Sequence, residues 1–139
     1  MEKGTMITVE AAVNAPVAKV WEYWTAPEHI TQWCAASDDW HAPNATNDVR
    51  VGGSFSTTMA AKDGSFSFDF GGEYTEVKDN EVIAYTMGDG RTARILFEDK
   101  GGSTNIVETF EAETENPVEM QQGGWQAILN NFKKHVEAN

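Results

Sequence analysis

The feature that most constrains this chain is a change of hydrophobic period near its C-terminal end. Between residues 40 and 111 the pattern is typical of β-structure, and after residue 116 the apolar residues recur at helical spacing. Turn-forming clusters divide the first region at fairly even spacing: Asp63-Gly64, Lys78–Asn80, Asp89-Gly90 and Lys100–Ser103. Because short loops can join only antiparallel neighbours, the sequence predicts an antiparallel meander followed by one long helix.

Alternation of apolar and polar residues predicts the individual strands. The clearest examples are Ile7, Val9, Ala11 and Val13 near the start, and the three Phe residues of the run from residue 65 to 70. We expect strands over Met6–Val13, Gly53–Ala61, Ser65–Val77, Val82–Met87, Thr92–Glu98 and Thr104–Glu111. Each such strand would bury one face against the rest of the domain.

Two short helices are predicted after the first strand. Asn14 and Pro16 provide a helix start, and the following apolar residues fall on one helical face: Val17, Val20, Trp21 and Trp24. Thr25 and Glu28 have the spacing of a capping box, which would begin the second helix. The apolar face of this second helix is expected to contain Ile30, Trp33 and Cys34.

The C-terminal segment predicts a long amphipathic helix. Asn116 is expected to be the N-cap, with Pro117 at the first helical position and Glu119 completing a capping box. One face carries Trp125, Ile128, Leu129, Phe132 and Val136. From Val118 to Val136 this helix would be roughly 28 Å long, enough to cross the domain. We therefore predict an α+β fold, in which a curved antiparallel sheet wraps around the helix and leaves a cup-shaped space.

The composition fits one domain covering residues 1–139, with 40% hydrophobic and 11% aromatic residues. The formal net charge of −12 argues against nucleic-acid binding, since phosphate backbones are repelled. Cys34 is the single cysteine, as expected of a cytoplasmic protein. No signal peptide is apparent, and no apolar run is long enough for membrane insertion.

Several ordered segments resemble a known superfamily. They are Ala15–Trp21, Pro27–Trp33, Asp48–Gly53, Asp63-Gly64, Gly71–Tyr74 and Gly124-Trp125, and together they span nearly the whole chain. The set is similar to the START-like (SRPBCC) or helix-grip superfamily. More narrowly, it resembles bacterial proteins similar to the C-terminal domain of the activator of the ninety-kilodalton heat-shock protein's ATPase. The resemblance implies a helix-grip fold with a cavity, in a superfamily that includes lipid carriers, polyketide cyclases and co-chaperone domains.

Aromatic residues are the main candidates for a ligand-binding site in the cup. They are Trp21, Trp24, Trp33, Trp40, Phe55, Phe68, Phe70, Tyr85 and Trp125, with Met59 and Met87 as adaptable neighbours. For any single one of them, ordinary core packing is the more common role. As a group, they suit a flat apolar ligand.

Arg94 and Glu108 are the candidate polar residues. They fall on two strands joined by the turn at residues 99–103 and could lie nearly opposite each other. If both face inward, they would form a buried pair able to orient a polar ligand group. If they face outward, they are an exposed pair worth under about 1 kcal/mol. A change of register by one residue decides between the two cases.

Other chemical motifs are weak. His41 follows Asp38 and Asp39, but no nucleophile with a clear partner accompanies it. The three His and Cys34 have no metal-site spacing, and the Gly pairs match no phosphate-binding loop. Gly71-Gly72 is expected to mark a bulge or bend, and Gly123-Gly124 to let the long helix approach the sheet closely.

Three functional hypotheses follow. The first is a module that binds a small hydrophobic or aromatic molecule, with no cofactor, metal or catalytic residue. The second is a cyclase- or hydrolase-like enzyme that uses Arg94, Glu108 or His41 in the same cavity. The third is a protein-interaction role like that of the co-chaperone domain, with a chaperone or another protein as the partner. A contiguous apolar patch outside the sheet would favour this last hypothesis.

Overall fold

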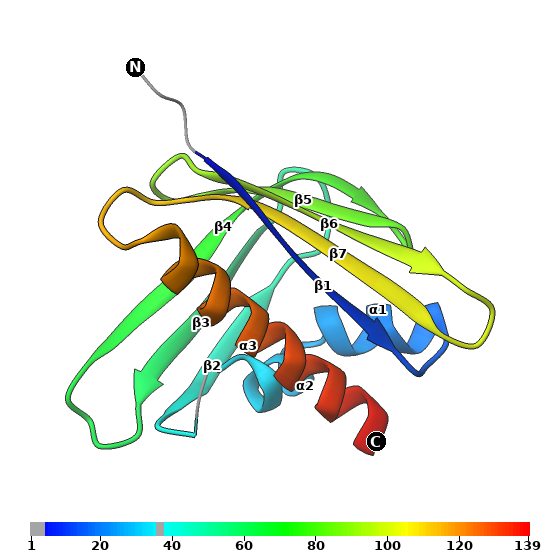
Figure 1. Ribbon diagram of the computed structural model, residues 1–139, viewed down its shortest axis with the longest axis horizontal. Coiled ribbons are helices and arrows are strands. Elements are labelled where there is room, and N and C mark those ends of the chain that lie inside the picture. The colour runs from blue at the N-terminus through cyan, green and yellow to red at the C-terminus, as the bar shows by residue number, and fades with distance from the viewer. Residues whose placement is uncertain (1–4, 36–37) are drawn as a thin grey trace.

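The computed structural model describes residues 5–35 and 38–139 of the chain. The first half contains β1 (Met6–Val13), α1 (Val17–Thr25), α2 (Pro27–Trp33), β2 (Trp40–Asn47) and β3 (Ser54–Ala61). The second half contains β4 (Ser67–Lys78), β5 (Val82–Met87), β6 (Thr92–Asp99), β7 (Thr104–Glu111) and α3 (Val118–Ala138). Figure 1 shows the strongly curled sheet with α3 lying along its inner side.

All seven strands belong to one antiparallel sheet, in the order β1-β7-β6-β5-β4-β3-β2. The meander from β2 to β7 has each strand beside its neighbour in sequence, as the turn spacing predicts. The remaining strand, β1, pairs with β7, so that Ile7 lies opposite Phe110. The predicted α+β class and its element order are thereby confirmed.

The inner face of the sheet carries the core. In β1 and β7 burial alternates strictly along the strand, because every second side chain points toward α3. The side chains of Val13, Ile95, Ile106 and Phe110 are fully buried. From α3, Leu129, Phe132 and Val136 pack onto this layer.

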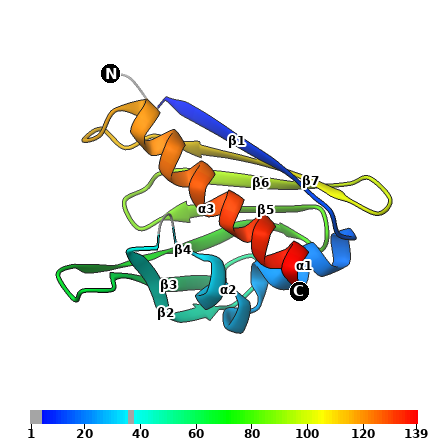
Figure 2. The ribbon, with the colours of Figure 1, turned by 60° about the horizontal axis from the view of Figure 1, so that its bottom comes forward.

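The long helix is not centred over the sheet. It packs most closely on β1 and on the two short helices, whereas α2 packs on β2. Figure 2 shows α1 and α2 at the end of the sheet where the C-terminal end of α3 lies. The arm formed by β2, β3 and β4 therefore curls round with few contacts to α3, and a space remains between them. In residues 5–35 and 38–139 no helix is long and apolar enough to cross a membrane.

The edge strand β2 has no matching strand among the sequence-based predictions. Its sequence, in which Pro43 is followed by four polar or small residues, lacks a clean alternation. The pairing of β2 with β3 shifts register between His41 and Asn44, and Pro43 falls within this irregularity. A proline has no amide to donate, so it is tolerated at a bulge of an edge strand.

Both predicted capping boxes are wrong. The Thr25 hydroxyl donates to the carbonyl of Trp21 at 2.8 Å, and Ala26 caps α2 without a side-chain hydrogen bond. At the start of α3 the N-cap is Pro117, while the Asn116 amide donates to Glu113. In each case the side chain finds a partner in the preceding turn, so it is not available to the helix that follows.

Gly71 and Gly72 lie where the backbone of a neighbouring strand leaves no room for a side chain. A Cβ atom added to Gly72 would be 2.4 Å from the carbonyl oxygen of Thr86, and one on Gly71 would be 2.5 Å from that of Phe55. No side chain fits at either position. The pairing of β4 with β5 shifts register just beyond, between Tyr74 and Glu76, which supports the predicted bend and bulge.

Candidate functional site

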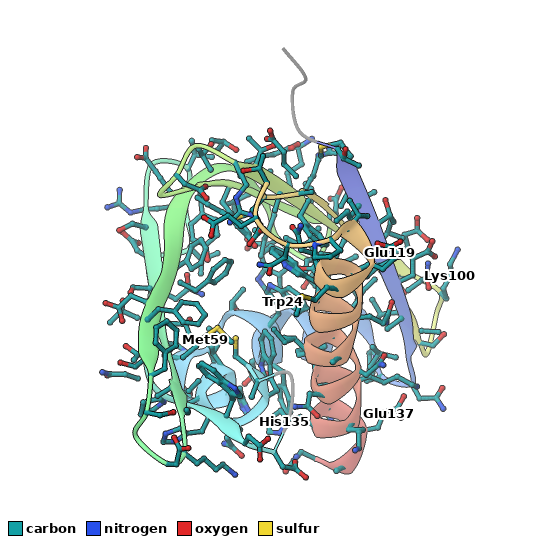
Figure 3. The ribbon with its side chains drawn as sticks, turned by 60° about the vertical axis from the view of Figure 1, so that its left-hand side comes forward. Trp24, Met59, Lys100, Glu119, His135 and Glu137 are labelled. Carbon is teal, nitrogen blue, oxygen red and sulfur yellow. The ribbon has the colours of Figure 1, made fainter. Side chains whose placement is uncertain are left out.

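A cavity of about 350 Å³ occupies the space between α3, the helix pair and the arm of β2, β3 and β4. This volume lies within the usual range of small-molecule sites. Figure 3 looks into this part of the molecule, with Met59 on the inner side of β3 and α3 across from it. The lining residues are Trp24, Ile30, Trp33, Cys34, Trp40, Asn47, Phe55, Thr57, Met59, Phe68, Phe70, Tyr74, Ile83, Tyr85, Glu108, Gln121, Gly124, Trp125 and Ile128.

Most of the residues expected at the site lie on this lining. They are Trp24, Trp33, Trp40, Phe55, Met59, Phe68, Phe70, Tyr85, Glu108 and Trp125. Three expected residues, Trp21, Met87 and Arg94, are not part of the lining.

Trp21 and Met87 pack into the body of the domain. The ring of Trp21 meets that of Phe97 edge-on, with 5.3 Å between the ring centroids. Met87 faces inward from the end of β5 but is buried within the main hydrophobic core. Helical spacing and strand alternation place both side chains on the correct face, yet neither pattern specifies which part of that face borders the cavity.

Arg94 and Glu108 form neither the buried nor the exposed pair that the sequence allows. Arg94 lies opposite Thr109, and Glu108 lies opposite Ile95, so the two side chains point to opposite faces of the sheet. On the outer face Arg94 contacts Glu76, with 3.1 Å between Arg94 Nε and Glu76 Oε1. The expectation that Arg94 lies in the cavity is therefore wrong. Arg94 would face inward only if the register of its strand were shifted by one residue.

Glu108 is left as an isolated acid on the inner face. Its side chain is 5% exposed and borders the cavity. Within the described ranges 5–35 and 38–139, no hydrogen bond or ion pair joins its carboxyl group to another side chain or to the backbone. Burial raises the pKa of Glu108 to about 8, because a carboxylate loses its hydration in an apolar environment.

Two other polar lining residues already have partners. The amide of Asn47 donates to the carbonyl of Thr25 at 2.8 Å, and its oxygen accepts from the Tyr74 hydroxyl. The Gln121 amide accepts from the backbone N–H of Glu113 and donates to the carbonyl of Asn116. Asn47 thus ties β2 to α1 and β4, and Gln121 ties α3 to the preceding loop. Both have structural roles.

The aromatic wall has two parts. On the helix side, the rings of Trp24 and Trp33 lie 5.1 Å apart, and the indole of Trp33 donates to the carbonyl of Tyr23. On the sheet side, the ring centroid of Phe70 lies 5.7 Å from that of Phe55 and 6.0 Å from that of Trp125 on α3. Such rings present rigid apolar faces to whatever enters the cavity.

Cys34 borders the cavity but is not an activated thiol. Burial, and after it the negative charge of Glu108, raises the pKa of Cys34 to about 12. A thiol with so high a pKa carries almost no thiolate at neutral pH and is a poor nucleophile. The expectation of a small packing residue is consistent with this environment.

Gly124 has a different role from the one that its sequence position suggests. A Cβ atom added to Gly123 or Gly124 would meet nothing within 4 Å, so neither glycine marks a close approach of helix and sheet. Gly124 instead borders the cavity, whereas Gly123 is exposed. The absent side chain of Gly124 is part of what leaves the cavity open.

Several lining residues are absent from the sequence-based set. Asn47 lies on the unrecognised strand β2, and Thr57 and Tyr74 lie inward from β3 and β4. Tyr74 continues the alternation of Phe68 and Phe70 along β4, so that pattern could have identified it. No comparable signal marks Asn47.

Catalytic and metal-binding arrangements are not evident at the other candidate residues. The His41 side chain is exposed and does not border the cavity. Across the part of the chain that the structure describes, no group of three or more His, Cys, Asp or Glu residues could hold a metal ion.

The sequence and the fold both match known proteins. Residues 14–137 match the family described as "Activator of Hsp90 ATPase homolog 1-like protein". The solution structure of an AHSA1-like protein from Aeromonas hydrophila is 44% identical, with a TM-score of 0.90, over 96% of this chain and 93% of that one. The solution structure of Chr148 from Cytophaga hutchinsonii is 60% identical, with a TM-score of 0.82, over 96% of this chain and 92% of that one.

More distant structures share the fold alone. Protein NE0264 from Nitrosomonas europaea is 22% identical, with a TM-score of 0.83, over 96% of this chain and 94% of that one. No curated protein matches the chain at a significant level.

Proposed function

Because the chain belongs to the family of activator of Hsp90 ATPase homolog 1-like proteins, a group within the helix-grip superfamily, we propose that it acts through its cavity. The proposed function is the reversible binding of a small hydrophobic or aromatic molecule. Covalent chemistry is not part of the proposal. The molecule would lie between α3 and the inner face of β3 and β4, against the aromatic wall.

The observation that carries this proposal is an open space bordered by rigid apolar side chains. The cavity of about 350 Å³ is left unfilled by the residues that the structure describes, although aromatic rings approach it from both sides. Protein interiors are normally packed as densely as organic crystals, so unfilled space of this size has a cost in stability. Binding of a matching molecule would recover the lost contacts.

The surrounding chemistry favours an apolar ligand. Among the lining residues that the structure describes, only Glu108 is ionisable at neutral or mildly alkaline pH, and none of them is a Lys, Arg or His. An anionic headgroup would therefore find no counter-charge there. Indole and phenyl faces suit a flat ring system, and Met59 can adapt to its outline.

The two alternative functions receive less support. An inward pair of Arg94 and Glu108 would favour an enzyme, but Arg94 lies on the outer face and only Glu108 borders the cavity. A contiguous apolar patch outside the sheet would favour a protein-interaction role. Among the described residues, the exposed large apolar side chains include Phe66 and Phe68, whose rings lie 6.0 Å apart beside Trp40 at the rim of the cavity. The others, Met6, Val51, Val118 and Met120, lie on other segments of the chain. We therefore propose no second function.

The test compares two leucine substitutions on the same helix. Gly124→Leu places a side chain in the cavity, whereas Gly123→Leu adds the same side chain at an exposed position one residue earlier. Binding of N-phenyl-1-naphthylamine, a neutral fluorescent probe, is measured by titration for the wild type and both variants. We expect saturable binding to the wild type and to Gly123→Leu, and a loss of roughly tenfold or more in affinity for Gly124→Leu.

A thermal-shift screen of aromatic and lipid-like metabolites then identifies ligand candidates. A ligand present at 100 times its Kd should stabilise the fold by about 2.7 kcal/mol, which is several degrees in Tm for a domain of this size. Equal probe binding by all three proteins would show that the probe binds elsewhere. Together with a screen that yields no stabilising compound, that result would refute the proposal.

A further inference from the structure

Glu108 is the one polar group of the cavity that points toward a specific ligand chemistry. It projects from β7 into the cavity wall with 5% of its side chain exposed, and within residues 5–35 and 38–139 its carboxyl group has no hydrogen-bond or ion-pair partner. The other ionisable groups that face it are the Cys34 thiol next to α2 and the Tyr85 hydroxyl on β5, both of which burial keeps protonated. A nearly buried acid with no partner among the described residues is costly, and natural domains rarely retain one without a role.

Three classes of polar ligand group can be compared at this position. An anionic group would meet a second acid and no cation, so it is disfavoured. A neutral acceptor such as a ketone could receive one hydrogen bond from the protonated acid. A cationic group could form a charge-assisted pair with the carboxylate and also contact the faces of the surrounding indole rings.

The whole protein favours the cation. Its formal net charge of −12 concentrates organic cations near the surface and raises their rate of encounter. The same field repels acids. Inside the cavity, the rings of Trp24, Trp33 and Trp125 provide the electron-rich faces on which ammonium groups are stabilised.

We propose that the ligand is a hydrophobic or aromatic amine whose ammonium group pairs with the carboxylate of Glu108. This inference rests on the proposed function, since it names the chemical class of the molecule that the cavity holds. The ring system of the amine would lie against the aromatic wall, and its ammonium group would point toward β7.

Binding would release one proton at neutral pH. The free protein holds Glu108 mainly as the neutral acid, because burial raises its pKa to about 8. The free amine is already an ammonium ion in water. When the pair forms, Glu108 gives its proton to the solvent, and no bond of the ligand changes. Affinity should therefore increase with pH up to about 8 and then level off, until the amine itself loses its proton.

The experiment compares three compounds that differ only in the polar group. They are 2-(1-naphthyl)ethylamine, 2-(1-naphthyl)ethanol and 1-naphthylacetic acid, titrated calorimetrically against the full chain from pH 6 to 9. Proton release at pH 7 is obtained by repeating the titration in buffers of different ionisation enthalpy. The variants are Glu108→Gln, which keeps the shape of the side chain, and Glu10→Gln, which removes one negative charge from the exposed face of β1.

The expected result is amine binding at pH 8 that is roughly tenfold or more tighter than alcohol binding. Both this preference and the proton release should disappear in Glu108→Gln and persist in Glu10→Gln. Alcohol binding as tight as amine binding, or the same preference in both variants, would overturn the inference and leave the proposed function intact. The inference would also be overturned if the neutral probe bound but none of the three compounds did. Failure of the probe and of all three compounds would overturn both proposals.

Discussion

His29 and His135 are joined by a hydrogen bond of 2.9 Å between Nδ1 of the first and Nε2 of the second. The bond connects α2 to the last turns of α3, and the Tyr23 ring stacks on His29 with a centroid separation of 3.8 Å. Because α2 and α3 both border the cavity, this histidine pair holds together two walls of the candidate site.

The histidine pair predicts a loss of stability on mild acidification. Burial and the neighbouring His29 lower the pKa of His135 below its ordinary value of 6.5. The unfolded chain therefore takes up a proton at a higher pH than the folded one, so the stabilisation is present above pH 6.5 and is lost as the pH falls through the lowered value. The measurement is urea unfolding followed by Trp fluorescence between pH 5 and 7.5, compared between the wild type and His135→Gln, because the opposing contribution of Glu108 is common to both proteins. The difference in unfolding free energy between the two should show this dependence on pH, and the difference between the wild type and the exposed His41→Gln variant should not.

Glu108 predicts a dependence on pH of opposite sign. Its pKa rises from 4.5 to about 8 on folding, so between these values the unfolded chain has lost a proton that the folded chain keeps. Stability should therefore fall as pH rises through this window and become level above it. The unfolding free energy of Glu108→Gln minus that of the wild type should therefore increase by several kcal/mol as the pH rises from 4.5 to 8.5. A difference that stays constant with pH would contradict the burial of this acid.

The two glycines of α3 predict stabilising substitutions. Glycine inside a helix is about 0.5–1 kcal/mol less favourable than alanine, and a Cβ atom at either position meets nothing within 4 Å. Gly123→Ala and Gly124→Ala should therefore each raise the unfolding free energy by this amount in chemical denaturation. A loss of stability in Gly123→Ala would show that the helix is packed at a position where the structure leaves it exposed.

The link between Asn47 and Tyr74 predicts a specific cost for removing one hydroxyl group. Tyr74→Phe leaves the oxygen of the half-buried Asn47 amide without the partner that it has in the wild type, at a cost of about 1–3 kcal/mol. Tyr23→Phe is the matched control, since the described hydrogen bonds do not include its hydroxyl. Equal unfolding free energies for the two variants would mean that the Asn47 link carries no net stability.

The sequence predicts the elements well where local chemistry decides them. Alternation over Met6–Val13, Val82–Met87 and Thr104–Glu111 matches the strands residue for residue, because a strand buried on one face needs apolar side chains at every second position. The helical spacing after Pro117 likewise identifies α3. Prediction from the sequence fails at β2, where Pro43 and the register shift remove the alternation. It also fails at both helix starts, where the polar side chains form hydrogen bonds with the preceding turn.

The cavity is decided by tertiary structure. The composition of the strands indicates an aromatic interior, but the number of residues that border open space depends on where α3 lies on the sheet. Arg94 and Glu108 show the same dependence at the scale of one residue, because pairing between neighbouring strands sets their register and thereby which side chain faces inward. By itself the sequence determined the elements and their order, through periodicity and turn chemistry that act over a few residues. Only the packing of distant segments decided that Glu108, without a partner among the described residues, lies in the wall of an open cavity.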